Sequence, residues 1–251
     1  MSIASRVLMY QLRDVSRSRW VIAYGLLFFG LTELLFRTAG GGDRVLLSLL
    51  NVVLLLVPLV SVLFGTLYLY SAREFIELLL AQPVERSALF GGLFGGLVVP
   101  LSIAFIAGVG APFAIHGGGS ASGTALATLL TVGTLLTLIS VAVAFLIALR
   151  FEDRARGFGV ALLAWLGATI VYDGIVLIII TLLEGRPLET PTLALMFLNP
   201  VDLARVILLI SFDLSALMGY TGPVLLRFFR RGIGLSPSLL LLSASAALPR
   251  S

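Results

Sequence analysis

The sequence predicts an all-α membrane protein with about six transmembrane helices, as one transmembrane domain over residues 1–251. Of the 251 residues, 59% are hydrophobic and only 12% are charged, whereas globular proteins average about 25% charged residues. The mean hydropathy is +1.10. The chain therefore lacks the polar surface that a water-soluble protein of this size needs, and lipid must solvate most of it.

The N-terminal segment 1–19 is predicted to be an amphipathic helix at the membrane surface. Its apolar residues recur at helical spacing opposite a basic face that holds Arg6, Arg13 and Arg17. No small-residue cleavage site closes the apolar run that follows, so a secretory signal is not indicated. A frayed basic tail is the alternative interpretation.

Five apolar segments have about the length of a membrane span: residues 20–36, 45–70, 88–115, 124–149 and 158–183. A sixth span is expected in the last fifty residues, at either 203–226 or 233–248. The first choice places Asp213 near the bilayer centre, at a cost of about 2.5–3.5 kcal/mol. The second choice is short for an upright span. The residues alone leave the two alternatives open.

The distribution of arginine predicts a cytoplasmic N-terminus, because cytoplasmic segments carry an excess of basic residues. With that orientation the inner segments hold nine Arg, and the outer segments through residue 202 hold three. The inner set is Arg6, Arg13, Arg17, Arg19, Arg73, Arg86, Arg150, Arg154 and Arg156. The outer set is Arg37, Arg44 and Arg186.

A second amphipathic segment, residues 71–87, connects the second and third spans on the predicted cytoplasmic side. Arg73 and Glu77 are four residues apart and are expected to pair. An apolar stripe of Phe75, Leu78 and Leu79 recurs at helical spacing, and a proline at position 83 ends the pattern. The stripe favours a docking surface for a cytoplasmic partner. A polar connector with a solvated charged face is the alternative.

The composition excludes several catalytic classes. The chain has seventeen Arg and no Lys, so it has neither the lysine of a nucleotide-binding Walker A loop nor a Schiff-base amine. With no Cys and a single His, it has no thiolate nucleophile and no paired-His zinc motif. That residue, His116, adjoins three glycines and is expected to lie in a loop. No enzyme activity, metal site or cofactor is expected on this chain.

Polar residues within the spans are candidates for a translocation path or its gate. Asp173 lies beside Tyr172 in the fifth span, where an ionisable residue indicates function; a structural hydrogen-bond anchor is an equal alternative. Asn51 in the second span is expected to bridge helices. Glu33 and Arg37 are expected to pair at the outer interface. Small residues at 91, 92, 95 and 96 predict close helix contact along the third span.

Several motifs are similar to those of a known family. The segment REFIELLLAQPVER (73–86) resembles the coupling helix of ABC exporter permeases of the type 2 superfamily. The segments VYDGIVL (171–177), NPVDLARV (199–206) and SALMGYTG (215–222) resemble those of the permease subunit of the nitrous oxide reductase maturation transporter. The resemblance covers nearly the whole chain.

The resemblance implies a homodimer in the bacterial inner membrane that binds two cytoplasmic ATPase subunits and a periplasmic accessory protein. ATP and magnesium would be bound by the ATPase, and no nucleic acid is involved. The residues implied for ATPase coupling are Arg73, Glu74, Glu77, Gln82, Glu85 and Arg86. The segment 199–231 would lie on the periplasmic side, with Asn199, Asp202 and Tyr220 as candidates for partner docking or gating. Residues 233–248 would then be the last span, shorter than in the family.

The expected function is export of a sulfur species or copper for cluster maturation of nitrous oxide reductase. Because the chain has no Cys and only scattered Met, it lacks the soft ligands of a copper relay, which favours the sulfur-containing cargo. The alternatives are a permease that exports lipid, drug or polysaccharide, and a non-transporting anchor that transmits ATPase motion to a periplasmic assembly factor.

Overall fold

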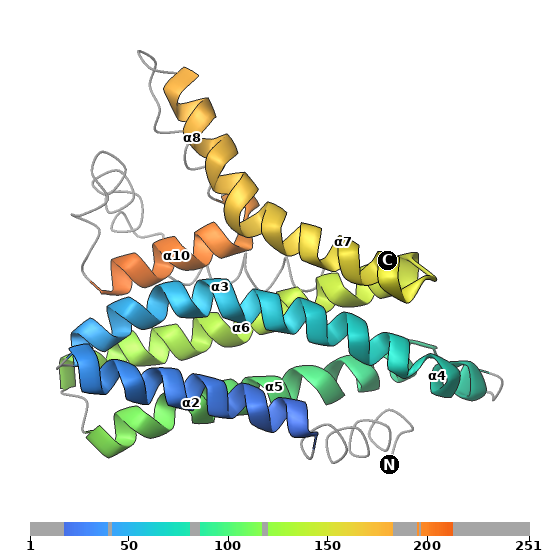
Figure 1. Ribbon diagram of the computed structural model, residues 1–251, viewed down its shortest axis with the longest axis horizontal. Coiled ribbons are helices and arrows are strands. Elements are labelled where there is room, and N and C mark those ends of the chain that lie inside the picture. Colours follow the sequence, from blue (N-terminus) through green and yellow to red (C-terminus); the bar gives the residue numbers. More distant parts are fainter. Residues whose placement is uncertain are drawn as a thin grey trace.

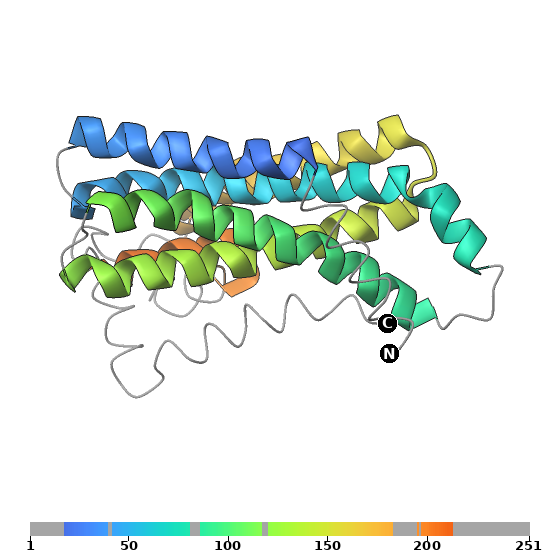
Figure 2. The ribbon, with the colours of Figure 1, turned by 90° about the horizontal axis from the view of Figure 1, so that it is seen from below.

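Long helices packed side by side form the core of the protein. The structure is a computed structural model that describes residues 18–39, 42–80, 86–116, 120–182, 195 and 197–212. Its bundle contains α2 (Arg19–Ala39), α3 (Gly42–Ser71), α5 (Arg86–His116) and α6 (Ser120–Arg150). Helix α2 packs on α5 and α3 packs on α6, as Figures 1 and 2 show. All the regular elements in the described part are helical, which confirms the predicted all-α class.

The core of the bundle is apolar, and most of its buried threonine hydroxyls are bonded within their own helices. Phe28, Leu97, Phe105 and Leu129 are fully buried in one continuous core. Buried threonine hydroxyls donate to carbonyls one turn earlier in the same helix, as Thr137 does to Gly133 at 2.9 Å. A bilayer offers no water to a backbone, so only such internally bonded elements can cross it.

Five stretches are long and apolar enough to cross a membrane, as the sequence predicts: Arg19–Thr38, Arg44–Ser71, Leu89–His116, Gly123–Arg150 and Arg154–Leu182. The helix predicted over 1–19 lies almost entirely outside the described residues, as does the alternative last span 233–248. Of the other alternative, 203–226, only residues 203–212 are described; they belong to α10 (Pro200–Ser211) and the turn at Phe212.

The fifth span is bent. It consists of α7 (Arg154–Leu166), a π-helical turn η1 (Gly167–Val171) and α8 (Tyr172–Leu182). Figure 1 shows α7 following the bundle and α8 leaving it at η1. The short helix α10 packs against α6 and α3 beside this bend. Its twelve residues give a length of about 18 Å, which is too short to cross a bilayer.

Two local expectations need correction. Of the glycines expected in close helix contact along α5, Gly92 and Gly96 are buried, whereas Gly91 lies on the exposed face with open space beside it. A close contact is made further along α5 by Gly108, where a Cβ would lie 2.6 Å from the carbonyl oxygen of Gly25 on α2. His116 is the last residue of α5 rather than a loop residue, and its ring stacks on Phe36 at 4.7 Å.

Candidate functional site

The predicted coupling segment forms a short helix, α4 (Arg73–Leu80), that continues almost directly from α3. Only Ala72 separates the two helices, and backbone hydrogen bonds pass through it. Its N–H donates to the carbonyl of Tyr68, and its own carbonyl accepts from the N–H of Ile76, both at 2.9 Å. This continuity fixes the start of α4 to the end of α3. We call this end of the helical bundle, where α3 leads into α4, the α4 end.

Helix α4 has an uncovered face of apolar and acidic side chains. Ile76 is buried against the bundle, whereas Phe75 and Leu78 of the predicted stripe are 39% and 70% exposed. The carboxylates of Glu74 and Glu77 are also exposed. An uncovered apolar stripe beside charged groups has the chemistry of a docking surface, in which apolar contact is combined with electrostatic selection.

The expected Arg73–Glu77 pair is not formed. Arg73 Nη1 instead donates to the carbonyl of Glu152 at 2.7 Å, in the turn between α6 and α7. The guanidinium also lies over the Tyr70 ring, 5.8 Å from its centroid. A charge-assisted bond to a fixed carbonyl is stronger than a screened surface ion pair on a helix, so the distant partner replaces the local one.

Tyr70 makes a second contact to the same turn. Its hydroxyl donates to the carbonyl of Phe151 at 2.8 Å. Asp153 begins α7 by accepting from the N–H of Ala155 at 3.0 Å, as an N-cap. Gly157, on the next turn of α7, is buried directly under Tyr70, and a Cβ there would lie only 1.8 Å from the hydroxyl oxygen. The end of α3 and the start of α7 are therefore closely fitted.

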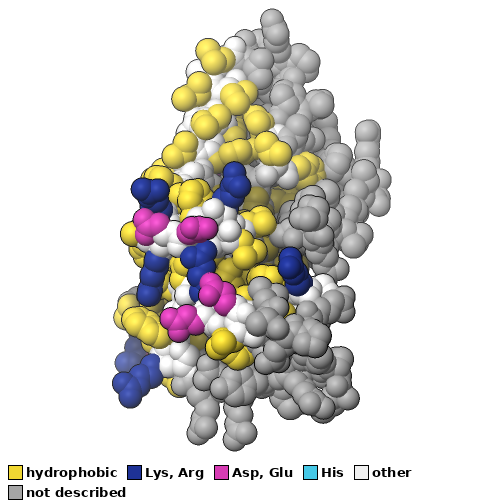
Figure 3. All heavy atoms as spheres, turned by 90° about the vertical axis from the view of Figure 1, so that its right-hand side faces the viewer, with side chains coloured by type: hydrophobic (Ala, Val, Ile, Leu, Met, Phe, Trp, Pro, Cys, Tyr) yellow, Lys and Arg dark blue, Asp and Glu magenta, His cyan; other side chains and the backbone are white. Residues whose placement is uncertain are grey.

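Charged side chains surround this junction. Figure 3 looks at the α4 end and shows basic and acidic groups gathered there among apolar ones. The exposed members near the turn between α6 and α7 are Arg150, Glu152, Asp153, Arg154 and Arg156, and Arg86 is exposed at the start of α5. Gln82 and Glu85, also predicted for ATPase coupling, lie outside the described residues.

A second polar cluster lies where the fifth span bends. Arg205 Nη1 donates to Asp173 Oδ2 at 2.9 Å and to Asp202 Oδ1 at 3.2 Å. The guanidinium and the Asp173 carboxylate are 34% and 37% exposed, whereas the Asp202 carboxylate is 10% exposed. Two carboxylates share one guanidinium, and the ion pair joins α8 to α10. Of the two interpretations of Asp173, the hydrogen-bond anchor therefore has a partner in this structure; its role in a translocation path remains a prediction.

Asn199 holds the start of α10 against the bend. Its Oδ1 accepts from the N–H of Val201 at 3.0 Å, and its Nδ2 donates to the carbonyl of Ala168 at 2.6 Å and to Asp202 at 3.1 Å. Asn199 and Asp202 are 4% and 8% exposed, and their side chains bond within this chain. Their predicted role in partner docking or gating remains a prediction, as does that of Tyr220, which lies outside the described residues.

The remaining predictions for polar residues within the spans concern Tyr172, Asn51 and the Glu33–Arg37 pair. The Tyr172 hydroxyl donates to the carbonyl of Leu195, close to the same bend. Asn51 is exposed on α3. Contrary to the expectation, it does not bridge helices within the described residues. The Glu33–Arg37 pair is formed, with Nε 3.1 Å from Oε1.

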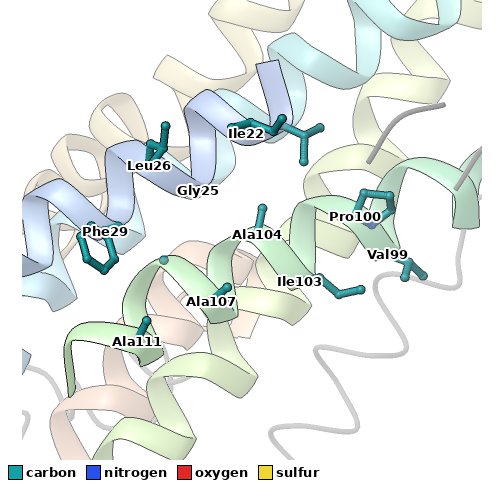
Figure 4. A pocket seen from close by; sticks show the side chains of 12 residues that line it. Ile22, Gly25, Leu26, Phe29, Val99, Pro100, Ile103, Ala104, Ala107 and Ala111 are labelled. Atoms are coloured by element: carbon teal, nitrogen blue, oxygen red, sulfur yellow. The ribbon is translucent and has the colours of Figure 1, made fainter. Parts of the chain in front are cut away.

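A groove between α2 and α5 has the wrong chemistry for a polar site. Its volume is about 690 Å³, and Figure 4 shows it lined by apolar and small side chains such as Leu26, Phe29, Ile103 and Ala107. None of the lining residues is titratable. Nor does any group of three or more potential ligands among His, Asp and Glu come together in the described residues to hold a metal ion.

Sequence reasoning missed Tyr70, Gly157 and Arg205. A signal for Arg205 was present, because it follows Asp202 by three residues in NPVDLARV, a spacing that brings side chains together on a helix. Tyr70 and Gly157 carried no such signal, since their partners are distant in the sequence.

Comparison with known proteins gives two relatives with the same name. The chain is 28% identical over 234 residues to the probable ABC transporter permease protein NosY of Pseudomonas aeruginosa, which covers 83% of this chain and 82% of the relative. It is also 28% identical over 222 residues to the probable ABC transporter permease protein NosY of Stutzerimonas stutzeri, covering 81% and 80%. No family model matches the chain. The similarity is a distant homology to a permease subunit, a type of chain that has no ATPase domain.

Proposed function

We propose that this NosY-like ABC transporter permease subunit receives the motion of a separate cytoplasmic ATPase through α4 and exports its cargo across the bacterial inner membrane. The observation that carries the proposal is the uncovered face of α4. Phe75 and Leu78 are exposed beside two carboxylates, while Arg73 bonds the base of the helix to the turn before α7. Such a helix can bind a partner and remain attached to the membrane-spanning bundle.

The energy for transport comes from another chain. This sequence contains no Lys and therefore no Walker A lysine to reach nucleotide phosphates. The working assembly is a homodimer with two ATPase subunits, which bind ATP and magnesium. The α4 end is cytoplasmic, in agreement with the excess of arginine in the segments on that side.

The cargo is a sulfur species or copper, passed to a periplasmic accessory protein for cluster maturation of nitrous oxide reductase. Support for this assignment comes from the motifs at 171–177, 199–206 and 215–222 and from the homology to NosY. Between the two cargoes we favour the sulfur species. Soft metals are carried by thiolate and thioether ligands, and this chain has no Cys and four scattered Met.

Two experiments test the proposal. Affinity purification of the tagged chain should recover a cytoplasmic ABC ATPase in stoichiometric amount; recovery of the chain alone would contradict the proposal. In a strain that lacks the gene, the dependent reductase should lack sulfide or copper in its cluster, and full cluster assembly would contradict the cargo assignment. ATP-driven conformational change without flux of any cargo would instead favour the non-transporting anchor.

A further inference from the structure

Helix α7 is fastened to α3 near both of its ends. At the α4 end, the Tyr70 hydroxyl donates to the carbonyl of Phe151 at 2.8 Å, just before α7 begins. Near the other end, the indole Nε1 of Trp165 donates to the carbonyl of Leu55 at 3.1 Å. Since α7 begins at Arg154 and ends at Leu166, these two bonds hold the helix near its first and its last residue.

The interval between the two bonds is also packed. Gly157 is buried under the Tyr70 ring. One turn further, Ala161 is fully buried in a small apolar cluster with Val62 of α3 and Ile147 of α6. Close-packed contacts of this kind transmit displacement because they have little room to deform.

The fastening stops just before the bend. The π-helical turn η1 begins two residues after Trp165, and α8 beyond it has no buried residue. Figure 1 shows α8 diverging from α3 at this point. A π-helical turn within an α-helix is often found at functional sites. This one separates the half of the span that is bonded to α3 from a half that is bonded to α10 instead, through the Asp173–Arg205 ion pair.

Helix α4 is itself weakly attached. Its eight residues give a length of about 12 Å, and among its described side chains only Ile76 is buried. Apart from the chain connection to α3, its base is attached to α7 through Arg73, which bonds the carbonyl of Glu152, and through the neighbouring Tyr70.

We propose that Tyr70 and Arg73 are positioning residues that link α4 to the start of α7, so that displacement of α4 by the ATPase moves α7 while η1 flexes. This inference rests on the proposed function. It assigns Arg73 a second role beside the ATPase contact predicted for it, and it gives Tyr70 a role that no motif in the sequence indicated.

The test uses the complete permease–ATPase complex with one spin label per permease chain. The chain has no Cys, so a Leu163→Cys substitution on the exposed face of α7, where Leu163 is 67% exposed, supplies a single labelling site. Pulsed EPR measures the distance between the labels of the two copies, with and without ATP. Ser71→Ala is the matched control, because the Ser71 hydroxyl bonds the carbonyl of Leu67 in its own helix and no other group among the described residues.

Tyr70→Phe removes the hydroxyl and keeps the ring. Loss of one hydrogen bond shifts an equilibrium about five-fold. With ATP, the ratio of complexes at the ATP-shifted label distance to complexes at the unshifted distance should therefore fall about five-fold. The amount of ATPase recovered should stay unchanged. Arg73→Gln should reduce the same ratio, and Ser71→Ala should leave it at the wild-type value.

An unchanged ratio in both Tyr70→Phe and Arg73→Gln would overturn the inference while leaving the proposed function intact. Loss of ATPase recovery in Tyr70→Phe would also overturn it, because Tyr70 would then act in assembly. If the wild-type complex fails to form or its label distance does not respond to ATP, the proposed function itself fails.

Discussion

A substitution at Gly157 tests the fit between α3 and α7. An added Cβ would lie 1.8 Å from the Tyr70 hydroxyl oxygen and 2.7 Å from its Cζ, so Gly157→Ala must displace the ring and break its bond to Phe151. Overpacking costs about 1–3 kcal/mol and the lost bond about 0.5–1.5 kcal/mol. Replacing a glycine inside a helix by alanine stabilises the helix by about 0.5–1 kcal/mol, which offsets part of this loss. The free energy of unfolding should therefore fall by about 1–3 kcal/mol.

The control lies two residues away. Nothing is within 4 Å of a Cβ built at Gly159, so Gly159→Ala should raise the free energy of unfolding by about 0.5–1 kcal/mol. Both variants are measured by unfolding in mixed micelles with increasing SDS. In a Tyr70→Ala background the obstruction is gone, and Gly157→Ala should then no longer lower the free energy of unfolding. Equal stability of the two alanine variants, or a penalty that persists without the Tyr70 ring, would refute the described packing.

Other predictions concern the bend and the α4 face. Arg205→Gln leaves two carboxylates without their guanidinium and should destabilise the protein by about 1–3 kcal/mol, because the cluster is only partly buried. Arg156 pairs with Asp153 on the exposed surface, so Arg156→Gln should change stability by less than about 1 kcal/mol; equal effects in SDS unfolding would refute the cluster. Asn199→Ala removes the α10 cap and should cost about 1–2 kcal/mol, while Asn199→Asp should retain the cap and lose the bond to the bend. Charge reversal of Glu74 and Glu77 to Arg should reduce recovery of the ATPase without lowering unfolding stability, and unchanged recovery would remove these carboxylates from the contact.

The sequence predicts the spans well because they depend on composition alone. A long apolar run must leave water wherever its neighbours lie, so the helices at 45–70 and 124–149 follow without knowledge of the tertiary structure. The short helix after the second span follows from local periodicity, which also needs no knowledge of the tertiary structure. In α4, Ile76 is buried and its neighbours face outward, as in an amphipathic helix.

The contacts that assemble the candidate site depend on tertiary structure. Tyr70 and Phe151 are 81 residues apart, and no local pattern brings them together. The local pairing rule failed at Arg73 because a carbonyl from a distant turn competes for the guanidinium. The π-helical turn at Gly167–Val171 has no composition that distinguishes it from the helices on either side. Asp173 was identified because an ionisable residue inside a membrane is energetically costly. Its pairing with Arg205 could be identified only from the tertiary structure.

Site-specific cross-linking tests whether α4 is the surface that binds the ATPase. Because the chain has no Cys, Leu78→Cys on α4 and Leu182→Cys at the far end of α8 each introduce one thiol, at positions that are 70% and 79% exposed. A short bifunctional cross-linker should join the chain to a co-purifying ABC ATPase from position 78 and not from position 182. Absence of the product at position 78 in an assembled complex, or equal yield at both positions, would contradict the assignment of α4 as the coupling helix.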